Sequence, residues 1–125
     1  MPEAPTGPVE RNEIVLVGRL GAAADTRSLA SGDEVASFRL IVRRESSRRP
    51  VRPTAPRAPV VDTVDCSAWT AALRRTVCRW EPGDVVEVHG ALRRRFWRSP
   101  GGGPASRYEV EVFTARRVRR ASGRR

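Results

Sequence analysis

The sequence contains no lysine, and its positive charge is carried by arginine alone. All 24 basic residues are arginine, against 14 acidic residues, and the formal net charge is +10. A guanidinium group binds a phosphate through two parallel hydrogen bonds and stacks on flat rings, whereas an ammonium group does neither as well. This choice of cation therefore favours a polyanionic partner.

Long apolar stretches are also missing. No run approaches the ~20 residues that a membrane span needs, and the opening MPEAPTGPVE lacks the basic and apolar regions of a signal peptide. At 125 residues the chain has room for one hydrophobic core. We therefore expect a cytoplasmic, nucleoid-associated protein that makes no membrane contact.

Catalytic and metal-binding residue types are scarce. The one histidine, His89, has no serine, cysteine or carboxylate placed to form a catalytic set, and it is predicted to lie on the surface. Cys66 and Cys78 have no neighbouring cysteine or histidine cluster, so a metal site is not expected. In a reducing cytosol both thiols are predicted to be buried, and a disulfide is the less favoured alternative. The sequence predicts no enzyme activity, no cofactor and no small-molecule substrate.

Charge is strongly segregated along the chain. Residues 43–59 hold six arginines and one glutamate, residues 93–107 hold five arginines and no acid, and residues 116–125 hold six arginines. These segments carry more positive charge than the whole chain, so the remainder is acidic on balance. Basic arms on an acidic body are typical of a nucleic-acid-binding protein.

The chain divides into a leader, one domain and a short tail. Residues 1–11 are Pro-rich and are predicted to be disordered, residues 12–118 form the domain, and residues 119–125 form a basic tail. Within residues 43–59, proline occupies every third position from Pro50 to Pro59, which favours an extended polyproline II loop. We favour a flap over a ligand because this loop joins two strands, with a Pro-x-x-Pro docking site for a protein as the alternative.

The first half of the domain is predicted to be β-structure followed by a helix. Residues 14–20 and 35–42 are strands, expected to form a hairpin, and Gly18 marks a bend. In residues 60–69 the alternation puts Val64, Cys66 and Ala68 in the core and Trp69 on the outer face. A helix over residues 71–79 follows, ended by Glu81-Pro82-Gly83-Asp84. Trp80, beside that turn, is predicted to fill the core.

The second half is predicted to be a long hairpin. In the fourth strand Val86, Val88 and Leu92 alternate inward, and Phe96, on the same face, is expected to cover the end of the barrel. The outward face holds Ala91, Arg93, Arg95 and Trp97. SPGGGPAS makes the tip, and residues 108–118 return with Val110 and Val112 inward. The predicted fold class is all-β: an OB-fold, which is a five-stranded curved barrel with one short helix between its third and fourth strands.

The alternation of arginines and rings in Arg93-Arg94-Arg95-Phe96-Trp97-Arg98 carries the functional prediction. A ring exposed on a basic strand stacks on any base while the arginines neutralise phosphates, so the sequence of the strand matters little. Sequence-independent binding of single-stranded DNA is therefore predicted. The predicted binding residues are Trp97, Trp69, Arg93, Arg95, Arg98, Arg43, Arg44, Arg48, Arg49 and Arg19.

The chain resembles the bacterial single-stranded DNA-binding protein family over about residues 12–118. The matching segments, in order, are NEIVLVGRLG, SGDEVASFRLIV, EPGDVVEVHGALRRRFW and SRYEVEV. The resemblance places the family's groove aromatics at Trp97 and Trp69. It leaves Thr63 and about Ser46 where the family has tryptophan, so two stacking platforms are missing.

The resemblance also implies a homo-oligomer, a tetramer or dimer, that acts in DNA replication, recombination or repair. The family tends to end in an acidic tip that recruits partner proteins, and this sequence ends in ARRVRRASGRR instead. Two alternatives stay open: an RNA-binding OB module of the cold-shock kind, and a protein-docking OB subunit.

Overall fold

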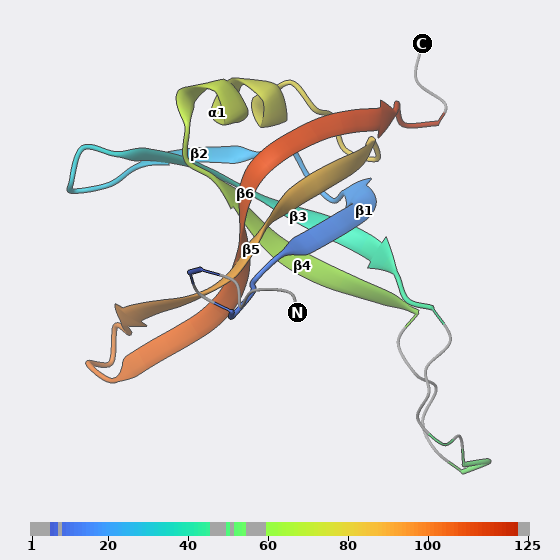
Figure 1. The fold of residues 1–125 in the computed structure, drawn as a ribbon, viewed down its shortest axis with the longest axis horizontal. Helices are drawn as coiled ribbons and strands as arrows, with labels where there is room; N and C mark the ends of the chain where they lie inside the picture. The colour runs from blue at the N-terminus through green and yellow to red at the C-terminus, as the bar shows by residue number, and fades with distance from the viewer. Residues whose placement is uncertain (1–5, 8, 46–49, 51, 55–59, 123–125) are drawn as a thin grey trace.

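The structure is a computed structural model that describes residues 6–7, 9–45, 50, 52–54 and 60–122. Within these residues six strands and one helix follow one another (Figure 1). They are β1 (Ile14–Leu20), β2 (Asp25–Ser28), β3 (Glu34–Arg43), β4 (Val61–Ala68), α1 (Ala71–Cys78), β5 (Val85–Arg98) and β6 (Pro104–Arg119). The expected disordered leader and polyproline flap fall largely outside the described residues.

The strands form one sheet that curls until its ends meet. Its order is β1-β5-β6-β4-β3-β2, and β1 also pairs with β3, which closes five of the strands into a barrel. The closing pairs are Arg19 with Ile41 and Leu20 with Leu40. Gly18 precedes them, and a Cβ atom there would lie 2.8 Å from the carbonyl oxygen of Ile41, so β1 and β3 approach closely at this glycine, while the predicted bend stays a prediction. The closed five-stranded barrel with one helix before β5 confirms the predicted OB-fold.

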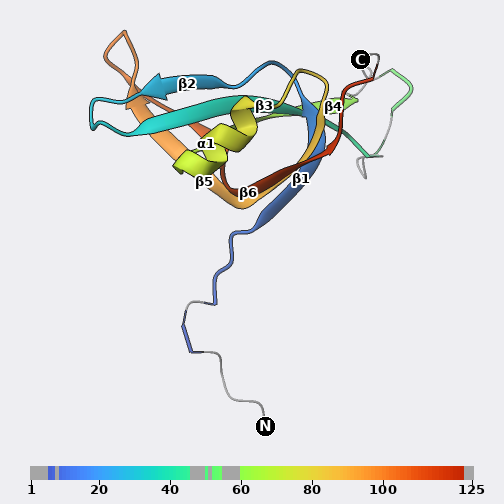
Figure 2. The same cartoon turned by 90° about the horizontal axis from the view of Figure 1, so that it is seen from above.

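The core lies inside the barrel and under the helix. It contains Leu20, Leu40, Cys66, Val77, Val86, Val88, Val110 and Val112, all nearly inaccessible to solvent. Trp80 is 4% exposed and meets Phe38 edge-on, with ring centroids 5.6 Å apart, so its predicted place in the core is confirmed. Figure 2 shows α1 across one end of the barrel, between β3 and β6. This helix starts at Thr70, whose side chain accepts a hydrogen bond from the Leu73 amide.

Three local predictions are corrected. The strands over residues 14–20 and 35–42 do not form the expected hairpin, because only two residue pairs join β1 and β3. Along the rest of its length β3 pairs with β2 and β4. The four-residue strand β2 is wholly exposed, so it has none of the apolar alternation that identifies a strand. Cys66 is buried as expected, but Cys78 is exposed, because the helix presents it away from the core.

The β5–β6 hairpin coils sharply and leaves the barrel, at the lower left of Figure 1. At Gly90 the register shifts and Phe113 has no partner, which marks a β-bulge in β6. A Cβ atom at Gly90 would lie 2.0 Å from the Glu111 carbonyl oxygen, so the strands touch there. After Ala91, no residue of β5 is buried.

That coiling overturns the predicted alternation at the end of β5. Ala91, expected outward, is buried at 3% exposure, whereas Leu92, expected inward, is 41% exposed. Phe96 was predicted to cover the end of the barrel, and it is 71% exposed. Side chains still alternate between the two faces of β5 here, but the face that was expected to meet the core is exposed to solvent.

The described end of the chain is tied to the barrel by Asp84. Its buried carboxylate accepts hydrogen bonds from the Glu81 amide at 2.9 Å and the Ala121 amide at 2.8 Å, and it pairs with Arg117 at 3.6 Å. The described residues just after β6 are therefore held against the barrel. Among the described residues, no helix is both long and apolar enough to cross a membrane.

Candidate nucleic-acid interface

A pocket of about 480 Å³ lies between the β5–β6 hairpin and the outer face of β3 and β4. Trp69 and Trp97, which reach it from β4 and β5, both line it, so the two predicted rings share one hollow. Trp97 is 47% exposed. The lining residues are Arg27, Leu29, Val35, Ser37, Ser67, Trp69, Arg95, Phe96, Trp97, Arg107 and Glu109.

Trp69 is held in place by contacts on each side. Its indole Nε1 donates a hydrogen bond to the Ser67 hydroxyl at 3.2 Å, and its backbone carbonyl accepts one from Arg74. The Arg95 guanidinium lies over the ring, with its carbon 4.8 Å from the ring centroid. A cation in this position is attracted by the negative face of the ring. The indole is thus presented to the pocket in a fixed orientation, with Arg95 beside it.

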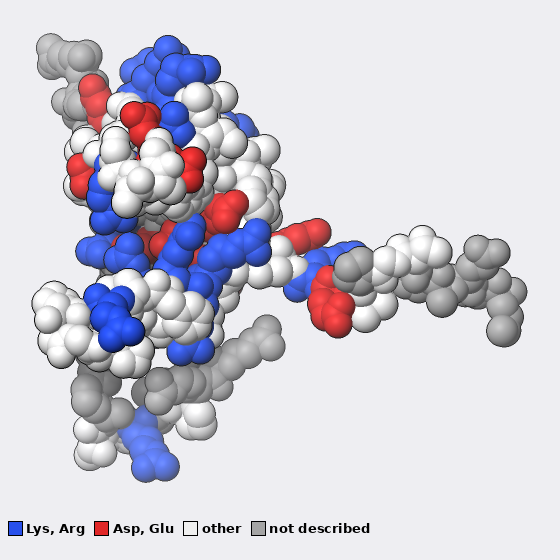
Figure 3. All heavy atoms as spheres, turned by 90° about the vertical axis from the view of Figure 1, so that its left-hand side faces the viewer, with Lys and Arg blue, Asp and Glu red and all other residues white. Residues whose placement is uncertain are grey.

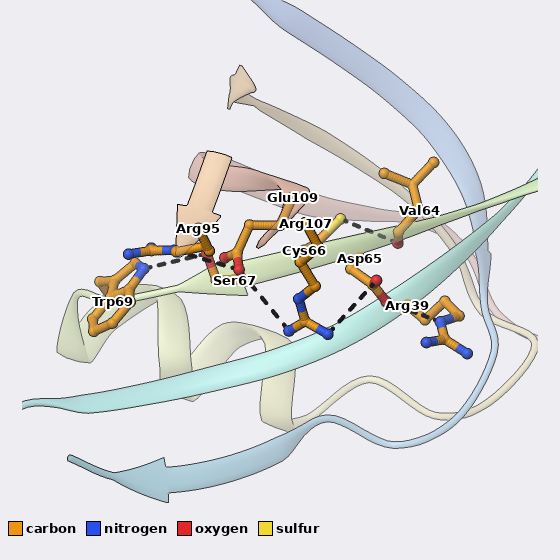
Figure 4. A network of polar contacts seen from close by, with 9 residues as sticks. All are labelled: Arg39, Val64, Asp65, Cys66, Ser67, Trp69, Arg95, Arg107 and Glu109. Carbon is orange, nitrogen blue, oxygen red and sulfur yellow. Dashed lines mark hydrogen bonds and ion pairs between the residues drawn. The ribbon is translucent and has the colours of Figure 1, made fainter. Parts of the chain in front are cut away.

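A row of alternating charges from four strands begins at this pocket and extends past it (Figure 4). Arg39 contacts Asp65 at 2.9 Å, and Arg107 lies 3.9 Å from Asp65 and 4.0 Å from Glu109. Arg95 completes the row with a contact to Glu109 at 3.4 Å. Three cations face two anions, so the row keeps one positive charge in excess.

These ion pairs orient the arginines without locking them. Exposed pairs are worth about 0–1 kcal/mol because water and salt compete with them. Arg39 and Arg107 are 61% and 51% exposed, so their pairs belong to this weak class. Glu109 is 8% exposed and holds Arg95 more firmly. An arriving phosphate therefore finds preoriented guanidinium groups whose carboxylate partners are easily replaced.

A second hollow continues the first across the barrel. It shares Ser37 and Arg107 with the first pocket and extends to Arg39, Ile41 and Thr63. The two hollows make one path, which we call the groove. Thr63, which stands where the family has tryptophan, lines this second hollow.

The other predicted arginines lie at the ends of the groove or beyond it. Arg93 shares the outward face of Arg95 and contacts Glu111 at 3.3 Å, and its guanidinium lies 6.0 Å from the Phe113 ring. Arg98, at the tip of the hairpin, donates to the Gly102 carbonyl at 3.3 Å.

Beyond the second hollow lie the arginines of β1 and the end of β3. The exposed Arg19 pairs with Ile41 across the closing strands. Arg43 ends β3, next to Arg44, whose hydrogen bond to Asp62 lowers the pKa of that carboxyl group. Arg48 and Arg49 lie outside the described residues.

Sequence reasoning missed Arg39, Arg107, Arg27 and Phe96 as groove residues. Arg39 follows Ser37 on the outer face of β3, a position that the alternation of 35–42 already marks as outward. Arg107 is opposite Arg95 in the hairpin register. The signal for both was therefore present, but their approach to Asp65 and Glu109 depends on pairing between β4 and β6, which are distant in sequence.

His89 lies on the surface, as predicted. Its Nε2 is 2.9 Å from the Glu87 carboxylate, and Arg116 contacts the same carboxylate at 3.4 Å. The hydrogen bonds from His89 and then Arg116 lower the pKa of Glu87. Within the described residues, no group of three or more His, Cys, Asp or Glu side chains is placed to hold a metal ion.

Basic and acidic side chains are interleaved over the face that carries the hairpin. Figure 3 shows blue and red groups side by side across the middle of this view, with a further basic cluster at its top. The acidic groups of the groove are those already paired to arginine.

Comparison with known proteins identifies the relatives of this chain. A model of the single-strand binding protein family matches residues 11–119. Among solved structures, the chain is similar to the Plasmodium falciparum SSB in complex with ssDNA, with a TM-score of 0.71 and 24% identity. The match covers 90% of this chain and 99% of that one, and at this identity it supports the fold.

Proposed function

Because the chain belongs to the single-strand binding protein family, whose members bind single-stranded DNA and are not enzymes, we propose that its groove coats single-stranded DNA without reading its sequence. The observation that carries this proposal is the presence of Trp69 and Trp97 in one pocket with Arg95 and Arg107. A solved relative of the same fold is in complex with ssDNA. The groove gives both halves of the required chemistry, which are flat rings for bases and guanidinium groups for phosphates.

Bases bind by stacking on the two indoles. Every base has a π-face, so a ring gives affinity without sequence preference. The face of Trp69 is already in contact with the Arg95 guanidinium. An incoming base takes the place of Arg95 over the ring or stacks on the guanidinium plane, which leaves Arg95 within reach of the next phosphate. A duplex keeps its bases stacked inside, so the groove discriminates against it.

Phosphates bind to the arginines along the groove and at its ends. Arg107 lies where the two hollows join, Arg39 extends the row, and Arg98 stands at the hairpin tip. Each phosphate that an arginine neutralises releases a counterion from the strand, so affinity falls as salt rises. Arg19, Arg43 and Arg44 continue the basic path from the second hollow. Arg48 and Arg49 follow in the sequence, and they are proposed to bind phosphates as well.

The protein acts as a homo-oligomer in the cytoplasm, on strands exposed during replication, recombination or repair. The outer edge of β1 supports self-association: on the side away from β5, no described strand pairs with Ile14–Gly18. Val15 and Val17 are 59% and 47% exposed beside that edge. An open edge flanked by apolar side chains is a template for pairing with a second copy. Sedimentation of the parent and of Val17→Lys tests this, since a shift of the variant towards monomer is the expected result.

The function is tested by titrating the protein with single- and double-stranded DNA of one sequence at low salt. Fluorescence anisotropy of the labelled DNA gives both dissociation constants. We expect the single strand to bind more tightly by at least about tenfold, which is about 1.4 kcal/mol. Equal affinity for the duplex contradicts the proposal. Tighter binding of poly(U) than of poly(dT) supports the RNA-binding alternative, and no binding of any strand supports a protein-docking role.

A further inference from the structure

The β5–β6 hairpin has a second face, turned away from the groove, that carries its own rings and cation. Successive side chains of a strand point to opposite faces, so Arg94 and Phe96 lie on the face opposite to Arg95 and Trp97, while Phe96 also borders the main pocket. Tyr108 of β6 pairs with Arg94 and shares its face. We call Arg94, Phe96 and Tyr108 the rear cluster.

The three side chains of the rear cluster are stacked on one another. The Arg94 guanidinium carbon lies 5.0 Å from the Phe96 ring centroid and 5.6 Å from that of Tyr108. Its Nε and Nη2 atoms donate to the Ser106 hydroxyl at 3.3 and 3.1 Å. This arrangement holds a cation between two rings in a fixed position.

The charge of the rear cluster differs from that of the groove. In the groove Arg95 is paired with Glu109, whereas no carboxylate in the described part of the chain pairs with Arg94. Phe96 and Tyr108 are 71% and 59% exposed. Two open rings around a cation without a carboxylate partner match a ligand that offers flat bases and anionic phosphates.

A continuous surface connects the groove to the rear cluster. Phe96 and Trp97 line the main pocket, and they also line a shallower hollow at the hairpin tip. Arg98, Pro104 and Ala105 complete that hollow. A strand that passes Trp97 therefore meets Arg98 at the tip and then the ring of Phe96, whose other neighbour is Arg94.

We propose that the rear cluster is a second contact site for single-stranded nucleic acid, at which a strand leaving the groove wraps round the hairpin and stacks further bases on Phe96 and Tyr108. This inference rests on the proposed function of the groove and adds a path beyond it. The hairpin is then gripped on both faces by one strand. Strands long enough to round the tip gain contacts that short strands do not reach.

The test compares short and long oligonucleotides on a variant of the rear cluster. Arg94→Gln with Tyr108→Leu removes the cation and one ring while leaving every residue that lines the groove in place. Arg75→Gln, on the exposed side of α1, is the charge-matched control for the lost arginine. The probes are dT oligonucleotides of about 8 nucleotides, within the ~4–16 that one OB-fold covers, and about 30 nucleotides.

The expected result is a selective loss with the long probe. Affinity for the short oligonucleotide stays at the parent value, while affinity for the long one falls by about fivefold or more, as expected for one lost stacked base. The control shows a much smaller loss with the long probe. An equal loss with both probes, or no loss with either, overturns the proposal.

A second measurement locates the strand directly. A long oligonucleotide that carries photoreactive 5-iodouracil is expected to crosslink to Tyr108, and a short one is not. Absence of that crosslink from a complex that does crosslink to Trp69 or Trp97 overturns the rear site while leaving the groove intact. Failure of the parent to bind even the short probe contradicts the proposed function itself, so the two failures are distinguishable.

Discussion

Replacing each tryptophan by alanine should separate binding from stability. Trp69 and Trp97 line the pocket, whereas Trp80 is 4% exposed and packs edge-on against Phe38. A stacked base is worth about 1–3 kcal/mol, a value measured on single-stranded-binding OB-folds of this same kind and carried over to this chain. Trp69→Ala and Trp97→Ala should therefore each weaken binding of single-stranded DNA by about 5- to 150-fold.

The stability of the three variants should fall in the opposite order. Removal of a buried tryptophan side chain costs about 3–5 kcal/mol, a large share of the roughly 5–15 kcal/mol that holds a domain together. Trp80→Ala is therefore expected to lower the melting temperature steeply. Trp69→Ala loses the Arg95 contact and the hydrogen bond to Ser67, which together amount to about 1–2 kcal/mol. Trp97, half exposed, should cost less.

Two assays on the same samples check this separation. Chemical denaturation gives the free energy of unfolding, and anisotropy with a labelled dT oligonucleotide gives the affinity at a temperature where all variants are folded. Trp69→Phe is the control, since it keeps a ring and should keep most of the binding. The reasoning is refuted if Trp97→Ala and Trp69→Ala bind like the parent, or if folded Trp80→Ala loses binding to the same extent as they do.

Three further outcomes follow from individual contacts. Gly90→Ala should destabilise the fold by about 3 kcal/mol or more, because its Cβ would meet the Glu111 carbonyl oxygen at 2.0 Å, while Gly101→Ala, with open space around it, should be neutral in the same melts. Iodoacetamide at pH 8 should label the exposed Cys78 and spare Cys66 until the protein unfolds, because burial and then the charges of Asp65 and Glu109 raise the pKa of Cys66 to about 12. Equal labelling of both thiols in the folded protein would contradict this. Arg119→Gln with Arg120→Gln should reduce the slope of log affinity against log salt by about 0.7 per lost phosphate contact, and an unchanged slope would show that the tail does not touch the strand.

The salt experiment uses substitutions because truncation would damage the fold. The sequence predicts a basic tail over residues 119–125, at the end of the basic segment 116–125. In the structure β6 runs to Arg119, and the Ala121 amide is bonded to Asp84. Deleting the whole segment would remove paired strand and leave the buried Asp84 carboxylate without two of its partners, Arg117 and the Ala121 amide, so its effect on binding would be confounded.

Local patterns predicted the parts of the site that local patterns determine. Alternation from Val64 to Ala68 fixed the outer position of Trp69, and the turn at Pro82 explained the burial of Trp80. Both inferences needed a few residues of sequence and one rule about strands or helix ends. The predicted meeting of Trp69 and Trp97 in one hollow agrees with the structure, and their contact with DNA stays a prediction.

The rest depended on events outside any one segment. The bulge at Phe113 and the close approach at Gly90 carry the hairpin out of the barrel. A glycine within β5 is visible in the sequence as a bend position, but the bulge lies in the partner strand and is not. Phe96 therefore lies on the predicted side of β5, but at that point this side faces solvent and not the core. The charge row through Asp65 and Glu109 likewise arises from the parallel pairing of β4 with β6, which no local pattern in either strand reveals.

Quenching of intrinsic fluorescence by poly(dT) tests the central claim most directly, since the chain has three tryptophans and only two of them line the groove. A base stacked on an indole quenches its emission, and a buried indole is out of reach. The parent protein should lose tryptophan emission as poly(dT) is added, until all of the protein is bound. The double variant Trp69→Phe with Trp97→Phe keeps rings for binding, so anisotropy should still report a complex while the remaining emission of Trp80 stays unchanged. Full quenching in that variant, or none in the parent once the complex has formed, would contradict the assignment of this groove.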